Sequence, residues 1–164
     1  MEQTVIWCDY NIEQDWLEKV FGNMAFSIRG NMDPEKKVEY EQRWVSGERP
    51  VLITKPQCCG FGMNWQHCHN VIFCGLSDSY ERFYQAVRRC WRFGQEHAVN
   101  VFIILSEAEI NILENIKKKQ AQMDEMQKQM TALMKEVTLS EIQHTTRITT
   151  TYAPQIEMEL PKWA

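Results

Sequence analysis

The sequence has 164 residues, 44% of them hydrophobic and 24% charged, so most of it is expected to fold as one ordinary domain with a further segment attached. Its formal net charge of −4 excludes a protein coated with basic surface for wrapping duplex DNA, and any contact with nucleic acid must therefore be local. No apolar run reaches membrane-spanning length and no leader is recognisable, so we expect no membrane partner and a reduced, cytoplasmic location in which the six cysteines stay free thiols.

Short apolar runs alternate with helical stretches, a pattern typical of a parallel sheet covered by helices on both faces. Strands are predicted at residues 4–8, 25–28, 51–54, 71–74 and 99–105, and helices at 12–21, 34–45 and 79–91. Pro34 after Asp33 is a helix-start signal, and Gly47 follows the end of the same helix. The predicted fold class is α/β, with right-handed crossovers that join these units around a mostly parallel sheet.

From Ser106 onward the composition is that of a long polar helix. A heptad-like seam with 3,4 spacing, interrupted at Lys119, consists of Ile112, Ile116, Met123, Met126, Met130, Leu133 and Val137. Two alternatives stay open: the helix packs on its own domain, or a coiled coil forms and residues 106–137 mediate self-association. The following segment is rich in β-branched residues, so we expect an extended tail and divide the chain into residues 1–116, 117–138 and 139–164.

One part of a usual nucleotide site is missing from the sequence. Nucleotide-hydrolysing proteins of this layout carry a phosphate-binding loop of the form GxxxxGK[ST], and no glycine here is followed by lysine. Asp9 follows the strand TVIWC, but Tyr10 rather than a second acid comes next, and we assign no metal site to it. The chain alone is therefore not expected to bind and cleave a nucleoside triphosphate in the usual way.

The segment QAVRRCWRFGQ, residues 85–95, concentrates positive charge in a mildly acidic chain. On a helix, Gln85, Arg89 and Arg92 would share one face because they lie at i, i+4 and i+7. Two permanently charged, planar guanidinium groups one turn apart suit the binding of phosphoryl oxygens. The alternative is a solvated basic face, which the flanking glutamines and glycine disfavour. We expect the two arginines on the side of the carboxyl ends of the strands, facing a cleft that another lobe completes.

QAVRRCWRFGQ resembles motif VI of superfamily 2 helicases and translocases, in the form Q-A-x-x-R-x-x-R-x-G-Q typical of the Swi/Snf-type branch. Upstream, GFGMNWQHCHNVIF resembles motif V, TVIWCDYN resembles motif IV, and FSIRGNMDPEKKVEYEQRW is similar to the stretch between them. The resemblance covers about residues 4–116 and implies a three-layer RecA-like (P-loop NTPase-like) domain, the second lobe of a two-lobe, nucleic-acid-dependent ATPase. The sequence departs from the family where Lys55, Pro56 and Gln57 replace Ser-Thr-Lys and where GLSDSYERFY replaces an Asp and Trp-Asn-Pro.

The resemblance also implies how the ATP site is shared between two lobes. Arg92 would be the arginine finger that reaches the γ-phosphate, and Arg89 would contact phosphate or the partner lobe. Gln85 would orient water or couple to motif V. ATP and Mg²⁺ would be held mainly by an N-terminal lobe of the same natural protein, so the isolated chain is expected to be inactive.

Further residues are expected to bind ligands. Gly60 and Gly62 would allow a tight backbone turn, and Asn64 would hydrogen-bond across the cleft or toward the ribose. Lys55, Gln57 and Asn11 follow strands at the edge where open α/β sheets bind ligands, so we expect them to contact the phosphates of DNA or RNA.

Two aromatic residues and a cysteine and histidine cluster allow other interpretations. Trp65 and Trp91 are expected in the core rather than stacked on a base. The cluster formed by Cys58, Cys59, His67, Cys68, His69 and Cys74 lacks the paired spacing of structural zinc sites. A zinc-binding module is therefore a weaker alternative function, and an oligomerising scaffold is another.

Overall fold

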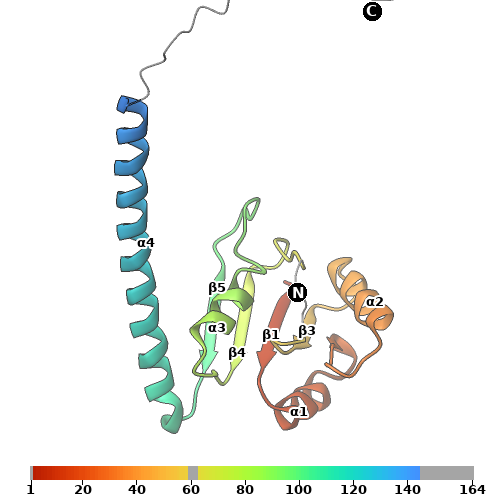
Figure 1. Cartoon of the computed structure of the whole chain (residues 1–164). Helices are drawn as coiled ribbons and strands as arrows, with labels where there is room; N and C mark the ends of the chain where they lie inside the picture. Colours follow the sequence, from red (N-terminus) through yellow and green to blue (C-terminus); the bar gives the residue numbers. More distant parts are fainter. Residues whose placement is uncertain (1, 59–62, 145–164) are drawn as a thin grey trace, which may run out of the picture. The chain divides into compact units, whose positions relative to one another are not determined.

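The structure, a computed structural model, describes residues 2–58 and 63–144. These residues form a five-stranded sheet in the order β2-β3-β1-β4-β5, and all neighbouring strands are parallel (Figure 1). The strands are β1 (Thr4–Cys8), β2 (Ala25–Ser27), β3 (Val51–Thr54), β4 (Asn70–Cys74) and β5 (Asn100–Ile104). All five lie within a residue of the positions that hydrophobic patterning predicts, so the predicted α/β class with a parallel sheet is confirmed.

The described helices are α1 (Asn11–Phe21), α2 (Pro34–Val45), α3 (Tyr80–Val87) and α4 (Ile110–His144), with short 3₁₀ helices at Gly22–Met24 and Glu107–Glu109. The start of α2 follows the predicted signal, since Pro34 occupies its first turn and the Asp33 carboxylate accepts a hydrogen bond from the Glu35 backbone N–H at 3.0 Å. At the start of α1, the Glu13 carboxylate accepts hydrogen bonds from the backbone N–H groups of Asp9 and Tyr10, each at 3.0 Å.

The sheet separates two apolar clusters. On one face, β1 contributes Val5 and Trp7 to a core that also contains Trp44 from α2, Ala86 from α3 and Ile116 from α4. On the other face, alternate residues of the strands pack against Leu17 of α1, and this second cluster consists of Ile6, Cys8, Leu17, Ala25, Val51 and Ile53. Helices thus pack on both faces, as an all-parallel sheet requires, and the expected three layers are present.

One helix is shorter than predicted. We expected a helix over residues 79–91, but α3 ends at Val87 and the chain continues through turns. The carbonyl oxygen of Arg89 accepts a hydrogen bond from the backbone N–H of Trp65 at 2.9 Å, so it does not continue the helical ladder. Gln85 is therefore helical while Arg89 and Arg92 are not, and the prediction that all three share one helix face is wrong.

The long C-terminal helix is present as expected. It continues through His144, so residues 139–144, which we placed in the tail, are helical. The rest of the predicted tail lies outside the described residues. The chain divides into two compact units, Met1–Met123 and Asp124–Ala164, and the division at residues 116/117 and 138/139 stays a prediction.

The heptad-like seam of α4 has two parts. Ile116 is buried in the core of the first unit, and Ile112 packs against the same core. Beyond these, the side chains of Met123, Met126, Met130, Leu133 and Val137 are all more than half exposed. No described helix has the length and apolar character needed to cross a membrane.

Candidate functional site

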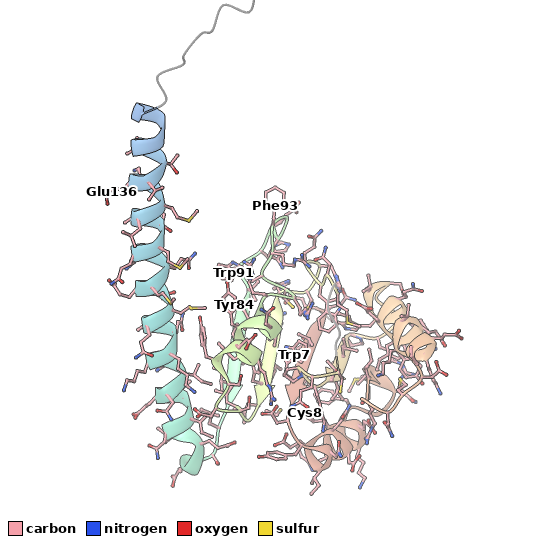
Figure 2. All side chains as sticks on the ribbon, viewed as in Figure 1. Trp7, Cys8, Tyr84, Trp91, Phe93 and Glu136 are labelled. Carbon is pink, nitrogen blue, oxygen red and sulfur yellow. The ribbon has the colours of Figure 1, made fainter. Side chains whose placement is uncertain are left out.

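The arginine segment lies at the amino ends of the strands. A right-handed crossover between parallel strands returns the chain from the carboxyl end of β4 to the amino end of β5, and α3 is the helix of that crossover. In Figure 2, Trp91 and Phe93 accordingly lie near the start of β5, whereas Cys8 marks the carboxyl end of β1. Our expectation that Arg89 and Arg92 lie on the side of the carboxyl ends is therefore wrong.

Backbone and side-chain hydrogen bonds join residues 63–69 to residues 88–95. Besides the bond from Trp65 to Arg89, a guanidinium Nη1 of Arg92 lies 3.5 Å from the carbonyl oxygen of Met63. The side-chain amide of Gln95 donates to the carbonyl oxygens of Cys68 at 3.1 Å and Cys90 at 3.2 Å. The motif V-like and motif VI-like segments thus form one surface, which we name the amino-edge site (Asn64, Arg89, Arg92 and Gln95).

The charge of Arg92 in the amino-edge site has no carboxylate partner among the described residues. Arg92 and its neighbour Arg88 are exposed, and among the residues that the structure describes no carboxylate lies within ion-pair distance of either. By contrast, Arg29 and Arg43 each pair with two carboxylates. Arg89, which follows Arg88 in the sequence, is half-buried, and Gln85 is exposed on α3. Exposed guanidinium groups without carboxylate partners are suited to binding an anion from outside the chain.

The amino-edge site rests on aromatic core. Trp65 is fully buried, stacks on Trp7 with ring centroids 5.5 Å apart, and donates from Nε1 to the Glu41 carboxylate at 2.7 Å. His67 packs edge-on against Trp44 at 4.9 Å, and its partial burial lowers its pKa. The expected core position of Trp65 is confirmed.

The other four residues that we expected in this region have different outcomes. Trp91 is 54% exposed, so its expected core position is wrong. Asn64 is exposed, and its side-chain amide lies 3.4 Å from that of Gln66. Gly60 and Gly62, for which we expected a tight turn, lie outside the described residues.

The residues expected to contact nucleic acid lie at the opposite edge. The Lys55 ammonium, just after β3, donates to the Asn11 side-chain oxygen at the start of α1 at 2.6 Å. Gln57 is exposed nearby in the chain. The structure brings Lys55 and Asn11 together because β1 and β3 are parallel neighbours whose carboxyl ends meet at the same edge. We name Asn11, Lys55 and Gln57 the carboxyl-edge site.

The sequence did not indicate a small cavity at this edge. It measures about 10 Å³, enough for one water molecule, and its lining includes Trp7, Asp9, Ser77 and Arg82. The chain leaves β1 and β4 toward opposite sides of the sheet, so the cavity lies at the switch point of the topology. Burial, reinforced by the Glu13 carboxylate, raises the pKa of Asp9, and the Arg82 guanidinium opposes that shift. Ser77 and Arg82 belong to GLSDSYERFY, where the sequence departs from the family pattern, and that departure could have drawn attention to them.

The thiols and imidazoles that the structure describes do not form a common metal site. Cys68 and Cys90 are buried, and the hydrogen bond with Cys68 together with burial raises the pKa of Cys90. Within residues 2–58 and 63–144, no three His, Cys, Asp or Glu side chains converge where a metal ion could bind. Cys59 of the cluster lies outside these ranges.

Comparisons with known proteins agree with this fold. The family described as "Helicase conserved C-terminal domain" matches residues 1–94. The structure is similar to the C-terminal part of the Fun30 ATPase domain (TM-score 0.64, 22% identity, covering 70% of this chain and 39% of that one). It is also similar to the C-terminal domain of the DEAD-box protein Dbp5 (TM-score 0.59, 18% identity, covering 73% of this chain and 70% of that one). No curated protein matches the sequence. These similarities confirm a RecA-like fold.

Proposed function

Because the chain belongs to the helicase conserved C-terminal domain family, we propose that it is the second lobe of a superfamily 2 motor that couples ATP hydrolysis to movement along nucleic acid. The aligned part spans 39% of the Fun30 chain, so the proposed activity is that of a longer protein with an N-terminal lobe. The Q-A-x-x-R-x-x-R-x-G-Q pattern favours the Swi/Snf-type branch.

The main support for this proposal is that the motif V-like and motif VI-like segments are hydrogen-bonded to each other at the amino-edge site. The Trp65 to Arg89 bond at 2.9 Å and the Gln95 to Cys68 bond at 3.1 Å join residues 63–69 to residues 88–95, and the Gln95 to Cys90 bond holds the second segment together internally. Movement of one segment therefore displaces the other. Such a connection suits a lobe that must respond to a nucleotide bound beside it.

ATP and Mg²⁺ belong mainly to the N-terminal lobe in this proposal. When bound there, ATP supplies phosphate groups whose negative charge grows on the transferred oxygens during hydrolysis. Arg92, as arginine finger, and Arg89 complement that charge, and the lack of a carboxylate beside Arg92 within the described residues fits this role. Asn64 hydrogen-bonds across the cleft or to the ribose, and Gln85 orients water or couples the two segments.

Nucleic acid, DNA or RNA, contacts the carboxyl-edge site in this proposal. The Lys55 ammonium is held by Asn11 at 2.6 Å, which orders it for contact with a backbone phosphate, and Gln57 adds a neutral hydrogen-bonding group. The isolated chain should show no ATPase activity stimulated by nucleic acid. The exposed half of the α4 seam, from Met123 to Val137, is compatible with self-association, which the mass of the chain in solution would test.

The decisive experiment is Arg92→Ala in the complete two-lobe protein. Loss of an arginine finger typically lowers turnover by about 10³-fold or more, and ATP affinity should change far less because the other lobe supplies most of the binding. Arg43→Ala is the matched control, since Arg43 is an arginine of α2 paired with Glu39 and Glu48. Turnover of Arg92→Ala equal to that of Arg43→Ala would refute the finger assignment.

A further inference from the structure

The turn after α3 presents a phenylalanine side chain entirely to solvent. Phe93 has a relative exposure of 103%, the highest among the exposed large hydrophobic residues of the described chain, and it lies at the tip of the turn in Figure 2. Single exposed apolar residues are common on protein surfaces. The neighbours and the conformation of this one are what distinguish it.

The turn that carries Phe93 has a fixed conformation. The backbone N–H of Gln95 donates to the carbonyl oxygen of Arg92 at 3.1 Å. The side-chain amide of Gln95 also donates to the carbonyl oxygens of Cys68 and Cys90, which anchors the turn to the rest of the lobe. Gly94 adopts φ +93°, and a Cβ added there would lie 3.1 Å from Oε1 of Gln66. Phe93 is therefore presented by a preorganised turn, which lowers the entropy cost of binding through it.

Exposed aromatic residues and arginines precede Phe93 in the same segment of the chain. Trp91 is 54% exposed and Tyr84 38%, and the Arg88 guanidinium carbon lies 5.7 Å from the Trp91 ring centroid and 5.9 Å from that of Tyr84. We name this surface the Phe93 patch (Tyr84, Arg88, Trp91, Arg92 and Phe93). Tryptophan, tyrosine and arginine are the residues most enriched at the energetic centres of protein interfaces.

We propose that the Phe93 patch docks on the N-terminal lobe when the motor closes, with Phe93 in an apolar pocket of that lobe. This inference rests on the proposed function, because that function places the other lobe against the amino edge. Charge complementarity supports the choice of partner: within the described residues neither Arg88 nor Arg92 has a carboxylate in ion-pair range, so their partner surface should carry acidic side chains or nucleotide phosphate.

Three observations favour a protein partner over nucleic acid. The guanidinium group of Arg88 already lies over the Trp91 ring, so that ring offers less of its surface to a base. The ordered Lys55 ammonium, our expected phosphate contact, lies at the opposite edge of the sheet. A single fully exposed ring on a tight turn also has the form of an anchor that fills a pocket.

The test measures closure of the complete two-lobe protein. One fluorophore on each lobe reports the closed fraction by energy transfer at saturating non-hydrolysable ATP analogue. Phe93→Ala should lower the equilibrium constant for closure by about tenfold or more, and Phe93→Leu should restore part of it. Gly94→Ala should also weaken closure, because it strains the turn while keeping the ring. Trp16→Ala removes an exposed aromatic of α1 (63% exposed) and should close normally.

The outcomes separate this inference from the proposed function. Normal closure by Phe93→Ala overturns the inference, and if Arg92→Ala still loses turnover the proposed function stands. Weakened closure by Phe93→Ala supports docking even if Arg92→Ala retains full turnover, a result that refutes only the finger role. Reduced nucleic-acid affinity of Phe93→Ala with unchanged closure would assign the patch to nucleic acid and overturn the inference. An unchanged melting temperature of Phe93→Ala shows that the variant is folded.

Discussion

The two edges of the sheet differ in construction, although they share the same strands. At the amino edge, Trp65 and Gln95 connect two segments to each other and to the aromatic core. At the carboxyl edge, the Lys55 to Asn11 bond joins two polar side chains, and a cavity the size of one water molecule lies at the same edge. A core-supported edge suits transmission of movement, whereas a polar and exposed edge suits contact with a charged strand that must slide. We therefore propose that the two edges bind different ligands.

The largest effect should come from removing the core support of the amino edge. Trp65→Ala deletes a fully buried ring that stacks on Trp7 and meets Trp44 edge-on at 5.3 Å. Loss of a buried large aromatic costs about 3–5 kcal/mol, so the free energy of unfolding in urea should fall by that amount.

Trp91→Ala is the matched control at the same edge. The Trp91 ring is 54% exposed, and the substitution should change the free energy of unfolding by about 0.5 kcal/mol or less. If both variants lost the same free energy of unfolding, the buried Trp65 ring would contribute no more to stability than the exposed Trp91 ring, and the amino edge would not depend on the aromatic core.

Lys55→Met tests the carboxyl edge through salt dependence. If Lys55 contacts one phosphate, the slope of the logarithm of affinity against the logarithm of salt concentration should decrease in magnitude by about one, at every nucleic-acid sequence tested. The measurement is a titration of the complete two-lobe protein with labelled single strands or duplexes at several salt concentrations.

The control for this titration lies on the same helix as Asn11. Lys19→Met removes an exposed charge in the last turn of α1, away from the carboxyl-edge site, and should leave the slope unchanged. A slope that changes in Lys19→Met but not in Lys55→Met would remove Lys55 from the nucleic-acid surface.

The smallest effect concerns pH at the amino edge. Burial lowers the pKa of His67 below its ordinary 6.5, so the unfolded chain takes up a proton before the folded chain does as the pH falls. The contribution of His67 to stability is therefore complete above about pH 6.5 and is lost as the pH falls through its folded pKa.

His67→Phe keeps a ring against Trp44 but removes the titration. Between pH 7 and pH 5, its free energy of unfolding should fall less than that of the original protein. Identical pH dependence in urea unfolding would show that His67 is as solvated when folded as when unfolded.

The fold could be predicted because its signals are local. Each strand is a short apolar run, and the central strands are buried on both faces, as Val5 and Ile6 illustrate on opposite sides of β1. The start of α2 was predictable for the same reason, since Asp33 and Pro34 act within one turn. Asn11 and Lys55 were predicted at the same edge of the sheet, whereas the hydrogen bond between them depends on the pairing of β1 with β3, which was not predicted.

The site was predicted less well because long-range contacts determine it. Helical spacing in QAVRRCWRFGQ favoured a helix through Trp91. In the structure α3 ends at Val87, and the carbonyl oxygen of Arg89 accepts a hydrogen bond from the Trp65 backbone N–H instead of from the next helical turn. That bond joins residues far apart in the chain, so local periodicity does not contain it. The exposure of Trp91 and the connecting role of Gln95 follow from the same turn.

Hydrogen exchange of the complete two-lobe protein tests most directly whether the two edges bind different ligands. A non-hydrolysable ATP analogue alone should slow exchange in residues 63–69 and 88–95 and leave residues 9–14 and 55–58 unchanged. Nucleic acid alone should slow exchange in the second pair of segments. Slowing by the ATP analogue at residues 9–14 and 55–58, with residues 88–95 unaffected, would contradict the assignment of the nucleotide to the amino edge.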